Sequence, residues 1–414
     1  MIALDLSRLL SRAGRGTPTG IDRVELAYAE HLIATDPSAC FAATIAFGGL
    51  GLVPRDRAEG FVAAIAAAWR GQGAAVGDPR HVRHLGRSAR LTASLGGERR
   101  LFAMLRQSPV PPVYLLVSHH HLEKPAILAR LKARSPARFV CLIHDLIPIE
   151  YPEYAKPGQA ENHRRRIETA VRFADALIVN SGVTRDALLP YLDRAGRDAP
   201  VLVAPLGLDL PSEPTDPGSP LDRPYFVYLG TIEARKNHLL LLNLWRQLAT
   251  ELGAAAPLLV LIGQRGWETE NVVDMLDRSP ALRGVVIEHN NLPDTEMVRL
   301  LKGARALLLP SFAEGFGFPV IEAFGVGVPA LCSDIPALRE TGGAIAEYLD
   351  PLDGPGWRQA ILDYAATNSP RRVAQLQRLA GWQPPSWQDH FAKVDRFIAE
   401  TAAVSTPALE PATQ

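Results

Sequence analysis

The chain has 414 residues, of which 47% are hydrophobic and 21% are charged, the composition of a soluble globular protein. Its 44 Lys and Arg residues balance 44 Asp and Glu residues, so net charge gives no general attraction to nucleic acid. The length exceeds one typical core and predicts two domains of about 200 residues each.

Signals for secretion, membrane insertion and metal binding are weak. The chain has no apolar stretch of about 20 residues that could span a membrane, and Met1–Asp5 becomes charged too soon for a signal peptide. Cys40, Cys141 and Cys332 lie far apart, so we expect buried, reduced thiols in a cytoplasmic protein. Consecutive side chains in His119–His121 point to alternate sides of an extended chain, which argues against a zinc site.

Short apolar runs alternate with helical patterns through residues 1–209. Strands are predicted at Ile2–Leu6, Phe41–Ile45, Val113–Val117, Phe139–Ile143 and Ala176–Val179. Such runs, separated by helices, predict parallel βαβ units that are buried on both faces. We therefore expect residues 1–209 to form a Rossmann-like domain.

The same alternation returns after a Pro- and Gly-rich linker at 210–222. Residues 223–385 are predicted to form a second doubly wound domain, with strands at Tyr225–Leu229, Leu258–Ile262, Val285–Ile287, Ala306–Leu309 and Pro329–Cys332. A helix is expected over 386–400, and 401–414 lacks periodicity and is predicted to be a disordered tail. The fold class is thus α/β, and a ligand is expected in the cleft between the two domains.

Polar and glycine residues follow several of the predicted strands. Gly20 opens a helix near Arg23 in the first half, and His144 and Asp145 come just past a strand. In the second half, Gly230 ends a strand. Arg235 and Lys236 lie at or just before the next helix, within the segment Leu229-Gly-Thr-Ile-Glu-Ala-Arg-Lys-Asn237. Cations there oppose the helix dipole unless an anion binds.

Two glutamates, Glu314 and Glu322, are the most informative feature of the second half. They lie in Pro310-Ser-Phe-Ala-Glu-Gly-Phe-Gly-Phe-Pro-Val-Ile-Glu-Ala323, which follows a buried strand. We expect a helix from about Val320 to Phe324, with Pro319 at its start, Glu314 on the loop and Glu322 in the first turn. Carboxylates beside the free N–H groups of a helix start suit a ligand with hydroxyls and a phosphate, such as a nucleotide sugar.

This stretch resembles the retaining glycosyltransferases of the GT-B fold, in particular glycosyltransferase family 4. The family signature places two glutamates eight residues apart in a Glu-Gly-Phe-Gly-x-Pro-x-x-Glu-Ala context. The resemblance implies two Rossmann-like domains around a cleft, with the last helix crossing back to the first domain. It covers most of Phe139–Tyr348 and is weakest over Leu50–Pro112, where we expect acceptor specificity.

The resemblance also implies roles. Its catalytic set is His144, Asp145, Glu314 and Lys236, and its donor-binding set is Gly20, Arg235, Lys236, Glu314, Gly315, Phe316, Gly317, Glu322 and Arg265. Arg235 and Lys236 would grip the donor diphosphate, Glu314 the sugar hydroxyls and Glu322 the ribose. Thr231 departs from members that carry arginine directly after the glycine, which leaves Arg235 and Lys236 to supply the charge. No metal and no cofactor are expected.

The pattern is most like mannosyltransferases of bacterial surface polysaccharide or lipopolysaccharide assembly. GDP-mannose is therefore the first donor hypothesis, with a UDP-hexose or deoxysugar as alternatives and a glycan or lipid-linked glycan as acceptor. A phosphorylase lacks support because no pyridoxal-phosphate lysine context is present, and a catalytically silent binding module stays as the alternative from another class. Ser181 is expected to cap a helix.

One stretch of the first half is strongly basic. Glu98 is the only acidic residue among a set of cations and histidines, namely Arg80, His81, Arg83, His84, Arg87, Arg90, Arg99, Arg100 and Arg106. Basic side chains are attracted to anionic lipid. We therefore predict a cytoplasmic protein with peripheral binding to the inner face of the cell membrane, the alternative being a solvated helical face with a soluble acceptor.

Overall fold

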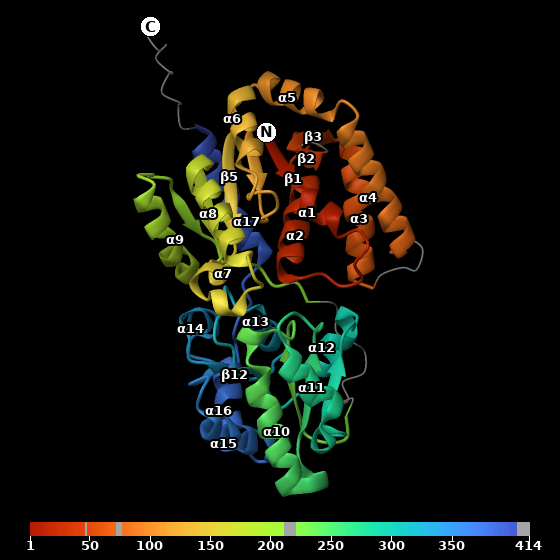
Figure 1. The fold of residues 1–414 in the computed structure, drawn as a ribbon, viewed down its shortest axis with the longest axis vertical. Coiled ribbons are helices and arrows are strands. Elements are labelled where there is room, and N and C mark those ends of the chain that lie inside the picture. The colour runs from red at the N-terminus through yellow and green to blue at the C-terminus, as the bar shows by residue number, and fades with distance from the viewer. Residues whose placement is uncertain (46–47, 72–76, 211–220, 404–414) are drawn as a thin grey trace.

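The computed structural model describes residues 1–45, 48–71, 77–210 and 221–403. Its first sheet has seven strands in the order β3-β2-β1-β4-β5-β6-β7. Their bounds are β1 Ile2–Asp5, β2 Cys40–Ile45, β3 Gly49–Val53, β4 Val113–Leu116, β5 Arg138–Ile143, β6 Ala176–Val179 and β7 Val201–Val203. Helices lie on both sides of this sheet (Figure 1). They are α1 Ser7–Ser11, α2 Gly20–Thr35, α3 Arg55–Trp69, α4 Pro79–Ser94, α5 Gly97–Gln107, α6 Pro125–Arg134, α7 Ile147–Glu150, α8 Gln159–Phe173 and α9 Gly182–Arg194.

The second sheet has six parallel strands in the order β10-β9-β8-β11-β12-β13. The strands are β8 Tyr225–Leu229, β9 Leu258–Ile262, β10 Val286–His289, β11 Leu307–Leu309, β12 Ala330–Ser333 and β13 Glu347–Leu349. The helices are α10 His238–Leu252, α11 Glu270–Arg278, α12 Asp294–Lys302, α13 Phe318–Gly325, α14 Pro336–Gly342, α15 Gly354–Ala365, α16 Pro370–Leu379 and α17 Trp387–Ala403. Both sheets are doubly wound, which confirms the predicted fold class.

One strand pair departs from the predicted parallel arrangement. β3 pairs with β2 in the antiparallel sense, because the short connection between them leaves no room for a crossover helix. Gly51 of β3 lies so close to α4 that an added Cβ would come within 2.2 Å of the Ala93 carbonyl oxygen. The glycines of this region therefore permit close helix–sheet packing.

The last helix returns to the first domain. Phe391, Val394 and Ile398 of α17 are buried in the same core as Leu4 and Val24, and α17 contacts β5 of the first sheet (Figure 1). α17 extends to Ala403, so residues 401–403, which were predicted to belong to the tail, are part of the helix. Residues 404–414, and 211–220 of the predicted linker, lie outside the described residues.

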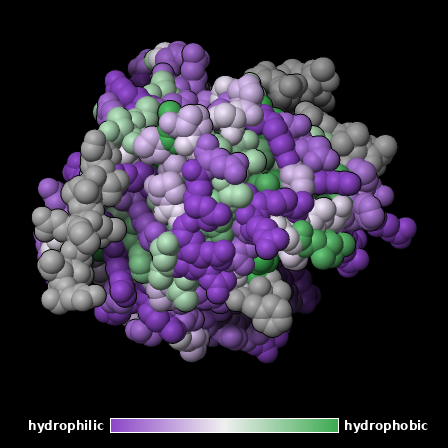
Figure 2. Space-filling view, turned by 90° about the horizontal axis from the view of Figure 1, so that it is seen from above, coloured by the Kyte–Doolittle hydropathy of each residue, from purple (hydrophilic) through white to green (hydrophobic). Residues whose placement is uncertain are grey.

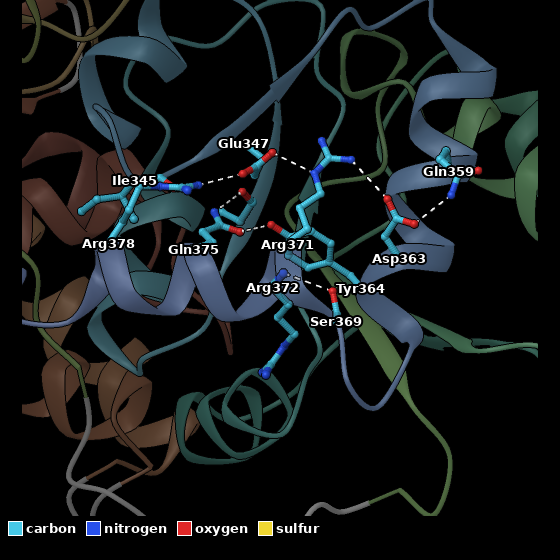
Figure 3. A network of polar contacts seen from close by, with 11 residues as sticks. Ile345, Glu347, Gln359, Asp363, Tyr364, Ser369, Arg371, Arg372, Gln375 and Arg378 are labelled. Carbon is cyan, nitrogen blue, oxygen red and sulfur yellow. Dashed lines mark hydrogen bonds and ion pairs between the residues drawn. The ribbon is translucent and has the colours of Figure 1, made fainter.

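Helix α16 is fixed to the second sheet by a buried polar network (Figure 3). The Gln375 amide donates to the Ala330 carbonyl at 2.8 Å and accepts from the Tyr364 hydroxyl at 2.6 Å. Arg371 Nε donates to Glu347 of β13 at 2.9 Å. These bonds satisfy buried polar groups and so anchor the segment that leads to α17.

Two further observations concern the cysteines and the length of the helices. Cys40, Cys141 and Cys332 are buried and form no disulfide. Among the helices that the structure describes, none is long and apolar enough to cross a bilayer.

Candidate functional site between the two sheets

The carboxyl edges of the two sheets face one another and are in direct contact. Arg23 of α2 donates to both carboxylate oxygens of Asp294 of α12 at 2.8 Å. The Trp267 indole donates to the Tyr154 carbonyl at 3.2 Å. α7 and α13 lie at this junction in Figure 1. The predicted site residues are therefore gathered at one interface, as expected for the carboxyl ends of parallel strands.

Glu314 lies at the centre of a charged cluster in the second domain. Its Oε1 accepts from Lys236 Nζ at 2.5 Å and from Ser311 Oγ at 2.7 Å, and its Oε2 accepts from Arg235 Nη1 at 3.0 Å. Arg235 Nη2 also lies 2.6 Å from Glu233 Oε1. Two cations thus meet two carboxylates, and the Lys236 and Glu314 side chains are only 7% and 6% exposed.

Burial and neighbouring charges shift the pKa values of Glu314, Lys236 and Arg235. Burial alone would raise the pKa of Glu314, but the positive charges of Lys236 and Arg235 outweigh it and lower that pKa to about 2. Burial and the neighbouring charge of Arg235 lower the pKa of Lys236. The pKa of Arg235 is raised because Glu314 and Glu233 overcome its desolvation. The result is a fixed pair of cations at the end of β8.

The backbone explains why these residues meet. The short 3₁₀ helix Ala234–Lys236 ends at Asn237, which adopts a left-handed conformation with φ 57° and begins α10. The Phe312 amide donates to the Arg235 carbonyl at 2.8 Å, which ties the loop after β8 to the loop after β11. Two strand-to-helix loops are thus locked together where an anion would approach.

The glycines of the Glu-Gly-Phe-Gly segment allow close approach between domains. A Cβ added at Gly315 would lie 2.9 Å from the Asp145 Cβ and 3.0 Å from the His144 carbonyl oxygen. The Gly315 carbonyl accepts from Ser181 Oγ at 3.1 Å. Gly317 has φ 92°, which favours glycine, and is the N-cap residue just before α13. Phe316 packs into the core of the first domain, so it joins the two domains.

Glu322 lies two residues deeper in its helix than predicted. α13 begins at Phe318, not at Val320, so Glu322 falls just beyond the first turn. Its surroundings include Arg23 and Asp294: burial and the Asp294 charge raise the pKa of Glu322, while the Arg23 charge opposes this rise. Glu322 and Glu314 therefore occupy different environments, one close to a cross-domain ion pair and one inside the cation cluster.

The structure fixes the tautomer of His144. Its Nε2 lies 2.8 Å from the Val117 carbonyl oxygen; a carbonyl can only accept, so Nε2 carries the proton and Nδ1 keeps its lone pair. Burial lowers the pKa of His144 to about 4. The backbone carbonyl of Asp145 accepts from His163 Nε2 at 3.0 Å. His144 can therefore accept a hydrogen bond through Nδ1 but not donate one there.

Two other predicted residues are placed less directly. Gly20 is the first residue of α2, and a Cβ added there would lie 3.8 Å from Phe318, so this helix start faces the second domain. Arg265 is engaged by carboxylates, with contacts of 2.6 Å to Asp277 and 2.7 Å to Glu288. The Arg265 guanidinium is thus already paired within its own domain.

Several residues of the interface were not predicted from the sequence. Glu233 completes the charge cluster and lies within the motif that contains Arg235, which is a signal that sequence reasoning could have used. Glu340 of α14 accepts from the Gly182 and Val183 amides at 2.7 and 3.2 Å. It thereby covers the start of α9 together with the predicted cap, Ser181, which accepts from the Thr184 amide. Glu340 carries no local motif.

Two concavities lie elsewhere in the molecule. One concavity of about 510 Å³ lies between α10 and α11, and another of about 520 Å³ lies beside α17 and the start of β1. Over the ranges that the structure describes, no three His, Cys, Asp or Glu side chains form a group able to hold a metal. The interface is instead marked by charge and by converging strand ends.

Two family models match consecutive parts of the chain. Glycosyltransferase Family 4 matches residues 56–211 and glycosyl transferases group 1 matches residues 211–344. Together with the two doubly wound domains, these matches define a GT-B glycosyltransferase. Within that class, the chain belongs to the glycosyltransferases of family 4 type, as the Glu-Gly-Phe-Gly segment predicts.

Several curated relatives are mannosyltransferases by name. O-antigen chain mannosyltransferase B of Escherichia coli is 28% identical over 259 residues, covering 61% of this chain and 68% of that protein. Serotype-specific mannosyltransferase WbdA of Escherichia coli is 27% identical over 250 residues, covering 56% of this chain and 30% of that protein. The chain thus spans about two thirds of the first relative's length and under a third of the second's.

Solved structures share the fold over nearly the whole chain. HepE of Anabaena in complex with UDP-glucose has a TM-score of 0.62 at 16% identity, covering 96% of this chain and 99% of that chain. Sucrose-phosphate synthase of Thermosynechococcus elongatus has a TM-score of 0.61 at 16% identity, covering 98% and 99%. These likenesses show the two-domain fold.

Proposed function

We propose that the chain is a retaining glycosyltransferase that moves a hexose from a nucleotide sugar to a glycan or lipid-linked glycan acceptor. One observation carries the proposal: partly buried Arg235 and buried Lys236 flank Glu314 at a strand end, directly across the interface from His144 and Asp145. A preorganised pair of cations suits a reaction in which negative charge grows on a leaving diphosphate.

Each residue has a proposed role. Arg235 and Lys236 stabilise the leaving diphosphate, Glu314 holds hydroxyls of the donor sugar, and Glu322 holds the ribose. His144 accepts a hydrogen bond from a sugar hydroxyl through its free Nδ1 lone pair. The acceptor attacks the face from which the diphosphate leaves, and the phosphate takes the acceptor proton. This route needs no protein base.

The donor base and sugar are proposed from the relatives' names. Two mannosyltransferases among the relatives support mannose, and GDP-mannose is our first candidate. The UDP-glucose held by HepE supports a UDP-hexose as the second candidate, with a deoxysugar donor as a variant of it. The O-antigen name supports a role in surface polysaccharide or lipopolysaccharide synthesis.

We also propose that no divalent metal takes part. The charges of Arg235 and Lys236 stand where a metal ion would otherwise neutralise the diphosphate. If turnover persists in the presence of a chelator, the result supports this proposal. If a chelator abolishes turnover and manganese or magnesium restores it, the result contradicts this proposal but leaves the assignment as a transferase unchanged.

A thermal-shift panel of nucleotide sugars tests the donor. A true donor binds only the folded state and stabilises it by RT ln(1 + [L]/Kd), so its effect grows with concentration. We expect GDP-mannose to raise the melting temperature more than UDP-glucose or free mannose. The alternative function, a catalytically silent binding module, would also bind a nucleotide sugar but would release no nucleoside diphosphate from it.

A further inference from the structure

The first domain buries three histidines in one cluster. Figure 2 shows that hydrophilic side chains cover most of the end of this domain that is seen from above, yet His119, His144 and His163 are only 7%, 5% and 3% exposed. The centroid of the His119 ring lies 5.4 Å from that of His144 and 4.9 Å from that of His163. Burial of a polar ring is costly unless the ring is hydrogen-bonded, so the partners of each ring indicate what it does.

His119 holds the backbone of His144. It lies three residues beyond β4, and its Nε2 accepts a hydrogen bond from the His144 amide at 3.2 Å. Because Nε2 accepts, a neutral His119 carries its proton on Nδ1. The same strand end supplies the Val117 carbonyl, which accepts from the His144 ring at 2.8 Å. The residues that follow β4 therefore bind both the backbone and the ring of His144.

His163 of α8 holds the next residue of the loop. Its Nε2 donates to the Asp145 carbonyl at 3.0 Å, and since that carbonyl can only accept, the proton of His163 is on Nε2. A third buried side chain, Asn180 at the end of β6, donates its amide to the His144 carbonyl at 3.0 Å. The backbone of His144 and Asp145 is thus fixed by side chains from three other elements.

Both supporting histidines are neutral at physiological pH. Burial lowers the pKa of His119, and the neighbouring His163 and His144 lower it further. Burial also lowers the pKa of His163, although the charge of Asp145 opposes this. A protonated His119 would carry a hydrogen on both nitrogens and could not accept from the His144 amide. The neutral ring is therefore the state that supports the loop.

The loop that these histidines hold faces the charge cluster of the second domain. A Cβ added at Gly315, next to Glu314, would lie 2.9 Å from the Asp145 Cβ and 3.0 Å from the His144 carbonyl oxygen. The two domains therefore meet closely at this loop. A misplacement of about 1 Å in a reacting site can lower a rate about a hundredfold. Support of the loop should thus affect turnover more than it affects donor binding.

We propose that His119 and His163 are positioning residues, which act through His144 and Asp145 and contact neither donor nor acceptor. They fix the place of the His144 ring, and with it the Nδ1 lone pair that would accept from a sugar hydroxyl. The inference deepens the proposed function and rests on it in one respect, that His144 contacts the donor sugar.

Matched pairs of variants test the two hydrogen bonds. His119→Gln can still accept from the His144 amide, and His163→Gln can still donate to the Asp145 carbonyl, because a glutamine amide offers both an acceptor and a donor. His119→Leu and His163→Leu occupy similar space without either bond. With the nucleotide sugar that stabilises the chain most, we expect the leucine variants to lower kcat about tenfold to a hundredfold at nearly unchanged donor KM. The glutamine variants should keep kcat within a few fold of the wild type.

A third histidine of the same run provides the control. His121 is buried, and its ring forms no hydrogen bond with any residue that the structure describes. His121→Asn keeps a residue type that tolerates the φ of 54° at this position, and it should leave kcat unchanged. Circular dichroism confirms that each variant is folded. Should a leucine variant not fold, His119→Asn or His163→Asn takes its place, because the shorter amide stays polar but does not reach the same partner.

A double variant tests whether His119 acts through His144. In a His144→Asn background, His119→Leu should lower kcat little further, because the ring that it positions is already gone. Losses that multiply fully in the double variant would overturn the proposal. Leucine variants with normal kcat, or glutamine variants as slow as the leucine ones, would overturn it as well.

Hydrogen exchange at the His144 amide gives a readout that needs no turnover. The amide should exchange faster in folded His119→Leu than in His119→Gln or the wild type, because only leucine leaves it without an acceptor. Equal exchange in all three would contradict the proposal. Wild-type protein that turns over no nucleotide sugar would count against the proposed function instead, and the exchange rates would still decide whether His119 holds the loop.

Discussion

Lys236 and Glu314 are held together across two loops, with Nζ of the lysine 2.5 Å from Oε1 of the glutamate. Lys236 follows β8 and Glu314 follows β11, which are neighbours in the second sheet. The pair joins two elements that each carry part of the predicted motif. It also shows that the lysine is preorganised, because both partners are buried before any donor binds.

Replacing Lys236 with alanine should slow transfer strongly. Loss of one preorganised electrostatic donor costs on the order of 2–4 kcal/mol in the transition state. Glu314 keeps Arg235 as a partner, so the fold should survive with a loss of about 1.5–3 kcal/mol in unfolding free energy. Steady-state kinetics with urea unfolding measures both. A folded Lys236→Ala protein with near-normal kcat/KM would refute the charge-clamp role.

Substitutions of Glu314 and of Glu322 should have different effects on nucleotide binding and on sugar transfer. Glu322→Ala should weaken binding of the bare nucleoside diphosphate, because it removes the proposed ribose contact. Glu314→Gln should leave that binding nearly intact but abolish transfer, because one carboxylate oxygen becomes an NH2 donor and the sugar hydroxyls lose their charged acceptor. Titration calorimetry and a transfer assay measure the two effects, and the reverse pattern would overturn the assignment.

His144 should stay neutral throughout the physiological range. Its folded pKa is lowered to about 4 by burial, so it should not titrate between about pH 6 and 8, unlike an unperturbed imidazole. Nitrogen-15 NMR should report a proton on Nε2 and none on Nδ1, with the signal assigned by its absence in His144→Asn. An acid limb of kcat/KM near pH 6.5 that disappears in His144→Asn would contradict this tautomer and its proposed role.

Glu25 should make stability depend on pH in the direction opposite to Glu314. Burial raises the pKa of Glu25 to about 8, above its unfolded value near 4.3, so the folded state binds a proton that the unfolded state has released. The contribution of the protonated Glu25 to the free energy of unfolding is complete below about pH 4 and is lost as pH rises through 8. Glu25→Gln should therefore be more stable than wild type at pH 8, by up to a few kcal/mol, and nearly equal to it at pH 4.5.

The contribution of Glu314 to the free energy of unfolding changes with pH in the opposite direction. Its pKa is lowered to about 2, so its stabilising contribution is present above about pH 4.5 and is lost as pH falls toward 2. Chemical unfolding at several pH values measures how Glu25 and Glu314 each contribute to the free energy of unfolding. A wild-type and Glu25→Gln pair with parallel pH profiles between 4.5 and 8 would contradict the buried, protonated Glu25.

The strands that sequence could predict are those buried on both faces. Tyr225–Leu229 and Leu258–Ile262 match the structure residue for residue because a continuous apolar run bounds them. β7 and β13 were missed because their three residues are only partly buried and carry no long apolar run. Short edge strands depend on their neighbours more than on their own composition.

The candidate site likewise divides into residues that lie in a local sequence pattern and residues that meet only through tertiary packing. Motif residues such as Glu314 and Lys236 were predicted because strand-to-helix loops gather at one edge of a parallel sheet. The pairing of Arg23 with Asp294 joins residues far apart in the chain, and that of Glu340 with α9 joins two domains. Such contacts arise from tertiary packing, and no local pattern encodes them.

The most direct test of the central claim is release of nucleoside diphosphate from a nucleotide sugar, with and without a glycan acceptor. The wild-type chain should turn over GDP-mannose, or a UDP-hexose or deoxysugar donor, faster with acceptor, and should transfer the sugar with retained anomeric configuration. Glu314→Gln should do neither while remaining folded. Folded wild-type protein that binds a nucleotide sugar yet turns over none of these donors would contradict the account and indicate a silent binding module.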